Sequence, residues 1–103
     1  MSEVRRLVLD VLKPHQPTML VLADKLGDLE GVHGVDITLI EIDNKVENIK
    51  ITLEGDDVDF QDVAEVVQDA GGSIHSIDKV SAGKRLIEEV ETPQDAGAPW
   101  MRM

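Results

Sequence analysis

Alternating apolar and polar residues predict four β-strands in this chain. In segment 4–12 Leu7, Leu9 and Val11 lie at every second position, so the face they share is expected to be buried. Segments 35–42 and 46–53 show the same alternation, and the polar residues 43–45 between them predict a hairpin turn. Segment 73–80 is the fourth predicted strand. The predicted inward positions of the first three strands are Leu7, Leu9, Val11, Val35, Ile37, Leu39, Ile49, Ile51 and Leu53.

Two further segments place apolar residues at helical spacing. The first runs over residues 17–26, with an alternative end at Leu29, and Pro17 suits the first helical position. The second follows a loop in which Asp57 or Asp59 is the expected N-cap, and it ends at Gly71. The residues predicted to face the core from these helices are Met19, Leu22, Ala23, Leu26, Leu29, Val63, Val66, Val67 and Ala70.

The order of these elements, β-α-β-β-α-β, predicts an α+β fold. It is the ferredoxin-like two-layer sandwich, in which an antiparallel sheet carries both helices on one face. Right-handed crossovers then place the first and third strands at the centre of the sheet. Residues 84–90 are expected to form a short extra helical turn or strand. We expect one domain over residues 1–90 and a mobile tail over residues 91–103.

Composition narrows the classes of function. The chain has 103 residues and a formal net charge of −11, and only 2% of its residues are aromatic. An acidic surface with few aromatic rings argues against binding to nucleic acid. The chain has no cysteine, which excludes disulfides, thiolate metal sites and cysteine nucleophiles. No apolar stretch approaches the ~20 residues that span a bilayer. We therefore expect a soluble, cytoplasmic protein with no nucleic-acid or membrane partner.

Acidic loops meet at one end of the predicted fold. Closely spaced carboxylates suit hard cations, so Ca²⁺ or Mg²⁺ is a candidate ligand there. The alternative is that one acid caps the second helix and the others are solvated charges near a helix N-terminus. The candidate metal ligands are Asp28, Glu30, His33, Asp56, Asp57 and Asp59.

The opposite end carries Lys13 and His15 beside the start of the first helix. Unpaired N–H groups at a helix start can hold an anion or a small carboxylate, which makes these two residues candidate ligand-binding residues. The alternative is an exposed turn without a ligand, because Pro14 and Pro17 remove backbone donors.

The sheet face away from the helices should carry an apolar patch. Such patches usually mark association, so the chain is expected to form homo-oligomers through this face or through the sheet edges. Asp10 also lies on this face, with Lys50, His75 or Lys79 as possible neighbours. This cluster is either an enzyme site between subunits around Asp10 and His75 or a structural ion pair. The predicted interface residues are Val8, Leu12, Ile40, Ile42 and Ile77.

Three families share this order of elements. Segment 29–37 resembles heavy-metal-associated domains, but the loop before the first helix lacks their cysteine pair. Amino-acid-binding ACT domains are similar in element order, and their Asp-x-Pro-Gly motif is absent. The chain most resembles an archaeal family known as domain of unknown function 211, in segments 6–15, 31–35, 74–78 and 83–85. That resemblance implies a ferredoxin-like subunit that assembles into homo-oligomers, with no assigned activity.

The sequence thus predicts a non-enzymatic, oligomeric binding or regulatory protein, with a divalent cation as a candidate ligand at the acidic loops. Two alternatives stay open. One is an ACT-like sensor of a small molecule near His15, and the other is an enzyme with a site between subunits around Asp10 and His75.

Overall fold

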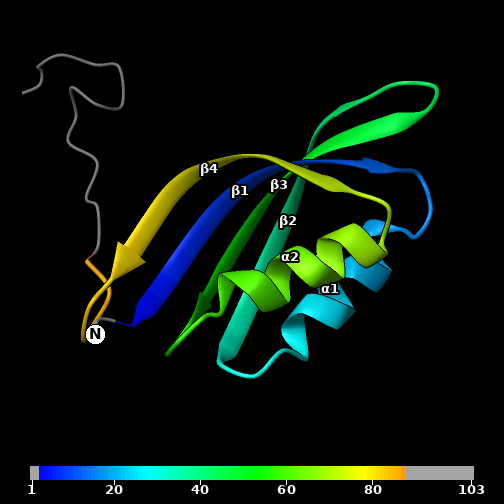
Figure 1. Cartoon of the computed structure of the whole chain (residues 1–103). Helices are drawn as coiled ribbons and strands as arrows, with labels where there is room; N and C mark the ends of the chain where they lie inside the picture. The colour runs from blue at the N-terminus through cyan, green and yellow to red at the C-terminus, as the bar shows by residue number, and fades with distance from the viewer. Residues whose placement is uncertain (1–2, 88–103) are drawn as a thin grey trace, which may run out of the picture.

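A computed structural model describes residues 3–87 of the chain. Six elements follow one another in the order β-α-β-β-α-β (Figure 1). They are β1 (Val4–Pro14), α1 (Met19–Gly27), β2 (Val32–Ile42), β3 (Val46–Gly55), α2 (Phe60–Asp69) and β4 (Ser73–Ala82).

The four strands form one antiparallel sheet in the order β2-β3-β1-β4. Both helices lie on the same face of this sheet, and the opposite face is open (Figure 1). This is the predicted ferredoxin-like α+β fold, with β1 and β3 at the centre and β2 and β4 at the edges. Neither helix within residues 3–87 is long and apolar enough to cross a membrane.

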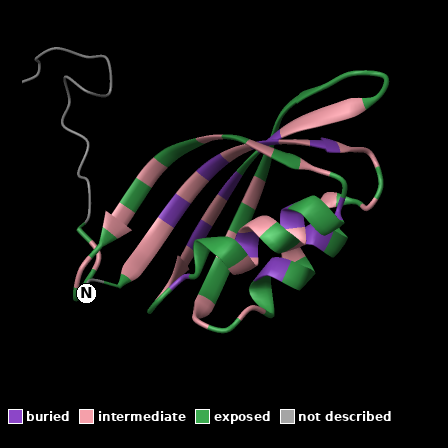
Figure 2. Ribbon diagram, in the orientation of Figure 1, coloured by how far each residue is buried: buried purple, intermediate pink, exposed green. Residues whose placement is uncertain are grey.

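The core lies between the helices and the two central strands. Alternate residues of β1 and β3 are buried, and they pack with one face of each helix (Figure 2). The alternation therefore identified the inward face of the central strands correctly. The buried apolar residues are Leu7, Leu9, Val11, Leu22, Leu26, Ile49, Ile51, Leu53, Val58, Val63, Val67 and Ala70.

The start of each helix has a side-chain cap. Thr18 is the N-cap of α1, and its hydroxyl accepts a hydrogen bond from the Val21 N–H. The predicted helical position of Pro17 is therefore wrong, because Pro17 lies just before the cap. At α2 the Asp59 carboxylate accepts hydrogen bonds from the Gln61 and Asp62 N–H groups, so Asp59 and not Asp57 is the cap.

Register shifts change which residues share a face of the sheet. Between Val8 and Leu9, the pairing of β1 with β4 shifts by one residue, and Ile77 comes opposite the buried Leu9. Because opposite residues share a face, Ile77 lies on the helix side and not on the open face predicted by simple alternation. An extra residue of this kind is a β-bulge, which uniform alternation does not reveal.

The edge strand β2 has a similar shift between Leu39 and Glu41. Ile40 falls at the shift, and Glu41 takes the place opposite the open-face residue Asn48. Ile42 then comes opposite Glu47. The residues of the predicted apolar patch therefore do not form one surface. Val8 and Leu12 lie on the open face as predicted.

The ends of the predicted segments also differ from the structure. β1 continues to Pro14, so Lys13 belongs to a strand and not to the following loop. Residues 83–87 form neither a helix nor a strand. Residues 88–90 of the predicted extra element, and the predicted tail 91–103, lie outside the described residues.

Candidate functional site

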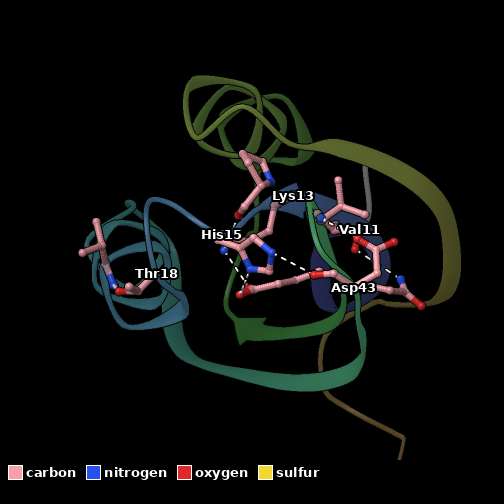
Figure 3. Close-up of polar contacts among 10 residues, drawn as sticks. Val11, Lys13, His15, Thr18 and Asp43 are labelled. Carbon is pink, nitrogen blue, oxygen red and sulfur yellow. Dashed lines mark hydrogen bonds and ion pairs between the residues drawn. The ribbon is translucent and has the colours of Figure 1, made fainter.

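A buried lysine side chain lies at the end of the fold where β1 meets the β2–β3 hairpin. Lys13 is only 1% exposed, and its register partner on β3 is Glu47. The Lys13 Nζ donates to Glu47 Oε1 at 2.9 Å and to the Pro14 carbonyl oxygen at 2.8 Å (Figure 3). The ammonium group thus has protein partners that replace water, as a buried charge requires.

His15 extends this cluster to the hairpin turn. Its Nδ1 lies 3.2 Å from Glu47 Oε2, and its Nε2 lies 2.9 Å from the Asp43 carbonyl oxygen (Figure 3). Both neighbours are hydrogen-bond acceptors, and a neutral imidazole can donate from only one nitrogen. The protonated ring therefore satisfies both contacts, and the neutral ring satisfies one.

These contacts lower the pKa values of two carboxyl groups. The hydrogen bond from Lys13 lowers the pKa of Glu47, and the contact with His15 lowers it further. At the turn, hydrogen bonds from the Lys45 and Val46 N–H groups lower the pKa of Asp43. Both carboxyl groups are thus held in the ionised form by the fold.

The predicted ligand site at Lys13 and His15 is therefore occupied by contacts within the protein. The Lys13 ammonium group points to Glu47, and both ring nitrogens of His15 face oxygens of the hairpin. The two predicted residues do lie at the same end of the fold, but their polar atoms bind Glu47 and Asp43. Their geometry favours a structural role in fixing the hairpin to β1.

The acidic end brings Asp56 between Arg5 and His33. Asp56 Oδ1 lies 2.9 Å from Arg5 Nη1, and Asp56 Oδ2 lies 3.2 Å from His33 Nε2. Glu30, Asp57 and Asp59 line a separate surface hollow, and the Asp59 carboxylate is engaged in capping α2.

The predicted metal ligands do not form a compact cation site. Asp28 lies at the C-cap of α1, where its N–H bonds the helix end. Within residues 3–87, no group of three or more His, Cys, Asp or Glu side chains is close enough to hold a metal ion.

The open face of the sheet is largely polar. Arg6 binds Glu54 through two contacts, of 2.8 Å from Nε and 2.7 Å from Nη2. Asp10 accepts a hydrogen bond from the Asn48 amide, which also donates to the Val11 carbonyl oxygen at 3.2 Å. The register places Asp10 opposite Lys50 and Ser76, and its bonded partner is Asn48 instead of His75.

A shallow hollow opens on this face between β3, β1 and β4. Its residues combine three basic side chains with two acidic ones, which gives it a local charge unlike that of the whole chain. The lining residues are Arg6, Val8, Lys50, Thr52, Glu54, Asp78 and Lys79.

Several large apolar side chains within residues 3–87 are more than a third exposed. Three of them, Leu39, Ile40 and Ile42, lie in the second half of the edge strand β2. Ile77 and Val80 lie on the other edge strand, β4, where the register puts them opposite Leu9 and Leu7 on the helix side. Both edges of the sheet thus carry apolar surface.

The chain matches the family model of domain of unknown function 211 (DUF211), described as an uncharacterised ArCR family, over residues 5–96. It is also 53% identical over 95 residues to the uncharacterised protein MJ0319 of Methanocaldococcus jannaschii, a match that covers 92% of this chain and 98% of that protein. The chain belongs to the DUF211 family. Membership confirms the predicted resemblance, and neither description assigns an activity to DUF211 proteins.

Sequence reasoning missed two residues that organise the ends of this DUF211 protein. Glu47 holds the buried Lys13, and Arg5 binds Asp56 and Glu3 at 2.9 Å and 2.7 Å. A signal for the first pair was present, because Lys13 follows Val11 and Glu47 precedes Ile49 on the inward alternation. Two opposite charges at inward positions predict an ion pair once the strands are paired.

Proposed function

We propose that this DUF211 protein is a non-enzymatic, cytoplasmic binding or regulatory protein that works as a homo-oligomer. The observation that supports the proposal most directly is the exposed apolar surface at both edges of the sheet. Ile40, Ile42 and Ile77 are each at least half exposed, and water contact with such side chains is unfavourable. Association of subunits would remove part of this surface from water.

The arrangement of polar groups supports a role other than catalysis. Lys13, Glu47, His15 and Asp43 contact one another and stabilise the end of the fold, instead of surrounding an open cleft. On the open face, Asp10 is bonded to Asn48, an amide that cannot act as a general acid or base. Binding or assembly therefore accounts for these groups better than proton transfer does.

Net charge sets how assembly should respond to salt. Copies with a charge of −11 repel one another, and this repulsion is screened when ionic strength rises. If apolar contact drives assembly, association should become tighter as salt is added. An assembly driven mainly by ion pairs would instead weaken.

Sedimentation velocity on the full chain tests this proposal. We expect a discrete species heavier than a monomer, more populated at about 1 M salt, where screening acts within about 3 Å, than at about 0.1 M salt. Native mass spectrometry of the same sample would give the number of subunits and any retained ligand. A monomer at every salt and protein concentration tested would overturn the proposal.

A second candidate is a sensor of a small anionic molecule, which the hollow on the open face favours. Arg6, Lys50 and Lys79 bring three basic groups to its lining in an otherwise acidic protein. Isothermal titration with a panel of small carboxylates and phosphates tests this function. Lys50→Gln should abolish the heat of binding, and Lys45→Gln, in the exposed hairpin turn, is the matched control.

A further inference from the structure

A surface hollow, the end hollow, lies at the end of the sheet where β1 and β2 begin and β3 ends. Arg5 of β1, His33 of β2 and Glu54 of β3 line it. Lys84 and Arg85, in the segment after β4, also line it. Figure 1 shows this segment beside the start of β1. The end hollow shares only Glu54 with the hollow on the open face, so the two are different places on the surface.

The base of the segment after β4 is held on both sides of Gly83. The Gly83 N–H donates to the Glu3 carbonyl oxygen at 2.8 Å, and the Gly83 carbonyl oxygen accepts a hydrogen bond from Arg5 Nε at 2.9 Å. The Arg5 side chain is only 16% exposed. A binding group loses less conformational freedom on binding when its backbone is already fixed. These contacts therefore prepare the residues after Gly83 for a ligand.

The conformation of Gly83 brings two consecutive side chains to the same hollow. Consecutive residues of a strand point to opposite faces. The strand β4 ends at Ala82, and Gly83 has a φ of +128°, a conformation that favours glycine. The chain thus leaves the strand geometry at Gly83, and both Lys84 and Arg85 line the end hollow.

The carboxylates of the end hollow already have cationic partners. Glu54 Oε2 lies 2.7 Å from Arg6 Nη2. Asp56 Oδ1 lies 2.9 Å from Arg5 Nη1, and Arg5 Nη2 also binds Glu3 at 2.7 Å. These three carboxylates are therefore engaged by two arginine side chains at the base of the hollow.

The two cations at the rim of the end hollow are not engaged in this way. Lys84 and Arg85 are exposed, and neither forms a hydrogen bond or an ion pair with another residue in the part of the chain that the structure describes. With these two, four lysine and arginine side chains face three carboxylates at this end. A local excess of positive charge is unusual in a chain with a net charge of −11, and it favours an anionic ligand.

A phosphate group matches the donors that Lys84 and Arg85 bring to the end hollow. An arginine guanidinium group can donate two parallel hydrogen bonds to two oxygens of one anion, and a lysine ammonium group binds a further oxygen as a point charge. A phosphate group carries three acceptor oxygens on one atom, whereas a carboxylate has two. Phosphate can therefore engage both side chains at once.

We propose that the end hollow is a binding site for the phosphate group of a small molecule, with Arg85 and Lys84 as its ligand-binding residues. The site requires no assembly of subunits, so it goes beyond the proposed homo-oligomer. It is also separate from the open-face hollow of the second candidate function. Because both side chains are exposed, binding should weaken as ionic strength rises.

Titration of the isotope-labelled full chain with inorganic phosphate tests the site. In amide proton–nitrogen correlation spectra recorded at constant ionic strength, we expect saturable shifts of the signals of residues 83–86. Acetate, titrated in the same way, should bind several-fold more weakly, because a carboxylate has only two acceptor oxygens.

Three variants locate the bound anion. Arg85→Gln removes a pair of charge-assisted hydrogen bonds and should weaken phosphate binding by about tenfold. Lys45→Gln, in the exposed hairpin turn, changes the net charge by the same amount and should leave the affinity unchanged. Lys50→Gln, in the lining of the open-face hollow, should also leave it unchanged.

The outcomes distinguish a specific site from general attraction of anions. Saturable shifts at residues 83–86 that only Arg85→Gln weakens support the proposal. Three results would overturn it: no saturable shift with phosphate, equal affinity for acetate, or equal weakening by Lys45→Gln. Weakening by Lys50→Gln alone would also overturn it, because the anion would then bind in the open-face hollow. None of these comparisons uses the sedimentation result, so this site and the proposed homo-oligomer can fail separately.

Discussion

Lys13 and Glu47 form a shielded ion pair between the neighbouring strands β1 and β3, with Nζ 2.9 Å from Oε1. The Lys13 side chain has no exposed surface, and that of Glu47 is 14% exposed. An ammonium group removed from water is stable only with well-placed partners, because its lost hydration costs several kcal/mol. The pair therefore makes the end of the sheet sensitive to either residue.

Removal of one partner of the Lys13–Glu47 pair should lower the stability of the fold. Glu47→Ala leaves Lys13 with the Pro14 carbonyl oxygen as its hydrogen-bond acceptor, and we expect a loss of about 3 kcal/mol in the free energy of unfolding. Lys13→Met should cost less, because it removes the buried charge and keeps much of the apolar volume. Urea unfolding followed by circular dichroism measures both changes.

The exposed Glu65 on α2 provides the control for charge removal alone. Glu65→Ala should change the free energy of unfolding by less than about 0.5 kcal/mol. Equal effects of Glu47→Ala and Glu65→Ala would contradict a structural role for the pair.

The same contacts predict how stability depends on pH. Glu47 and Asp43 have lowered pKa values in the folded protein, and unfolded Glu and Asp titrate near about 4. Below about pH 5 the unfolded chain therefore binds protons more readily, and these two groups lose their stabilising effect as pH falls through their folded pKa values.

Glu47→Gln isolates one of these groups. We expect the variant to be less stable than the wild type at pH 7, and the difference between them to shrink as pH is lowered toward about 2, where the wild-type carboxyl group also becomes neutral. Urea unfolding at a series of pH values measures the difference. A difference that stays constant across this range would show that ionisation of Glu47 does not contribute.

The fold could be predicted because it depends on repeated local patterns. Inward positions such as Leu9 and Ile51 recur at every second residue, and the turn at Asp43 separates two such runs. These patterns determine the type and order of the elements, and handedness then determines their arrangement. The candidate site depends on long-range register, which local patterns do not contain.

Ile77 illustrates what local sequence patterns cannot predict. Uniform alternation from Val80 assigns it to the open face, and the register shift beside Leu9 reverses that assignment. The partnership of Lys13 with Glu47 similarly requires the exact pairing of residues 34 positions apart in the chain. The surface on which a binding function depends was therefore less predictable than the core.

The cap of α2 offers a direct test of one choice that the sequence left open. Asp59 accepts the Gln61 N–H at 2.8 Å, so Asp59→Ala should lower the free energy of unfolding by about 1 kcal/mol. Asp57→Ala removes the same charge from the same exposed loop and should have a smaller effect. Urea unfolding compares the two variants. A larger loss of stability for Asp57→Ala would show that Asp59 is not the cap.

Gly55 lies so close to Gly31 that a side chain cannot be accommodated. A Cβ atom at Gly55 would lie 1.8 Å from the Gly31 carbonyl oxygen, which also accepts the Asp56 N–H at 3.0 Å. Gly55→Ala should therefore separate β2 from β3 locally and cost about 3 kcal/mol. Gly27→Ala is the control, because nothing lies within 4 Å of its Cβ position. Thermal unfolding should show a clear loss for the first variant alone, and equal midpoints would refute the close contact.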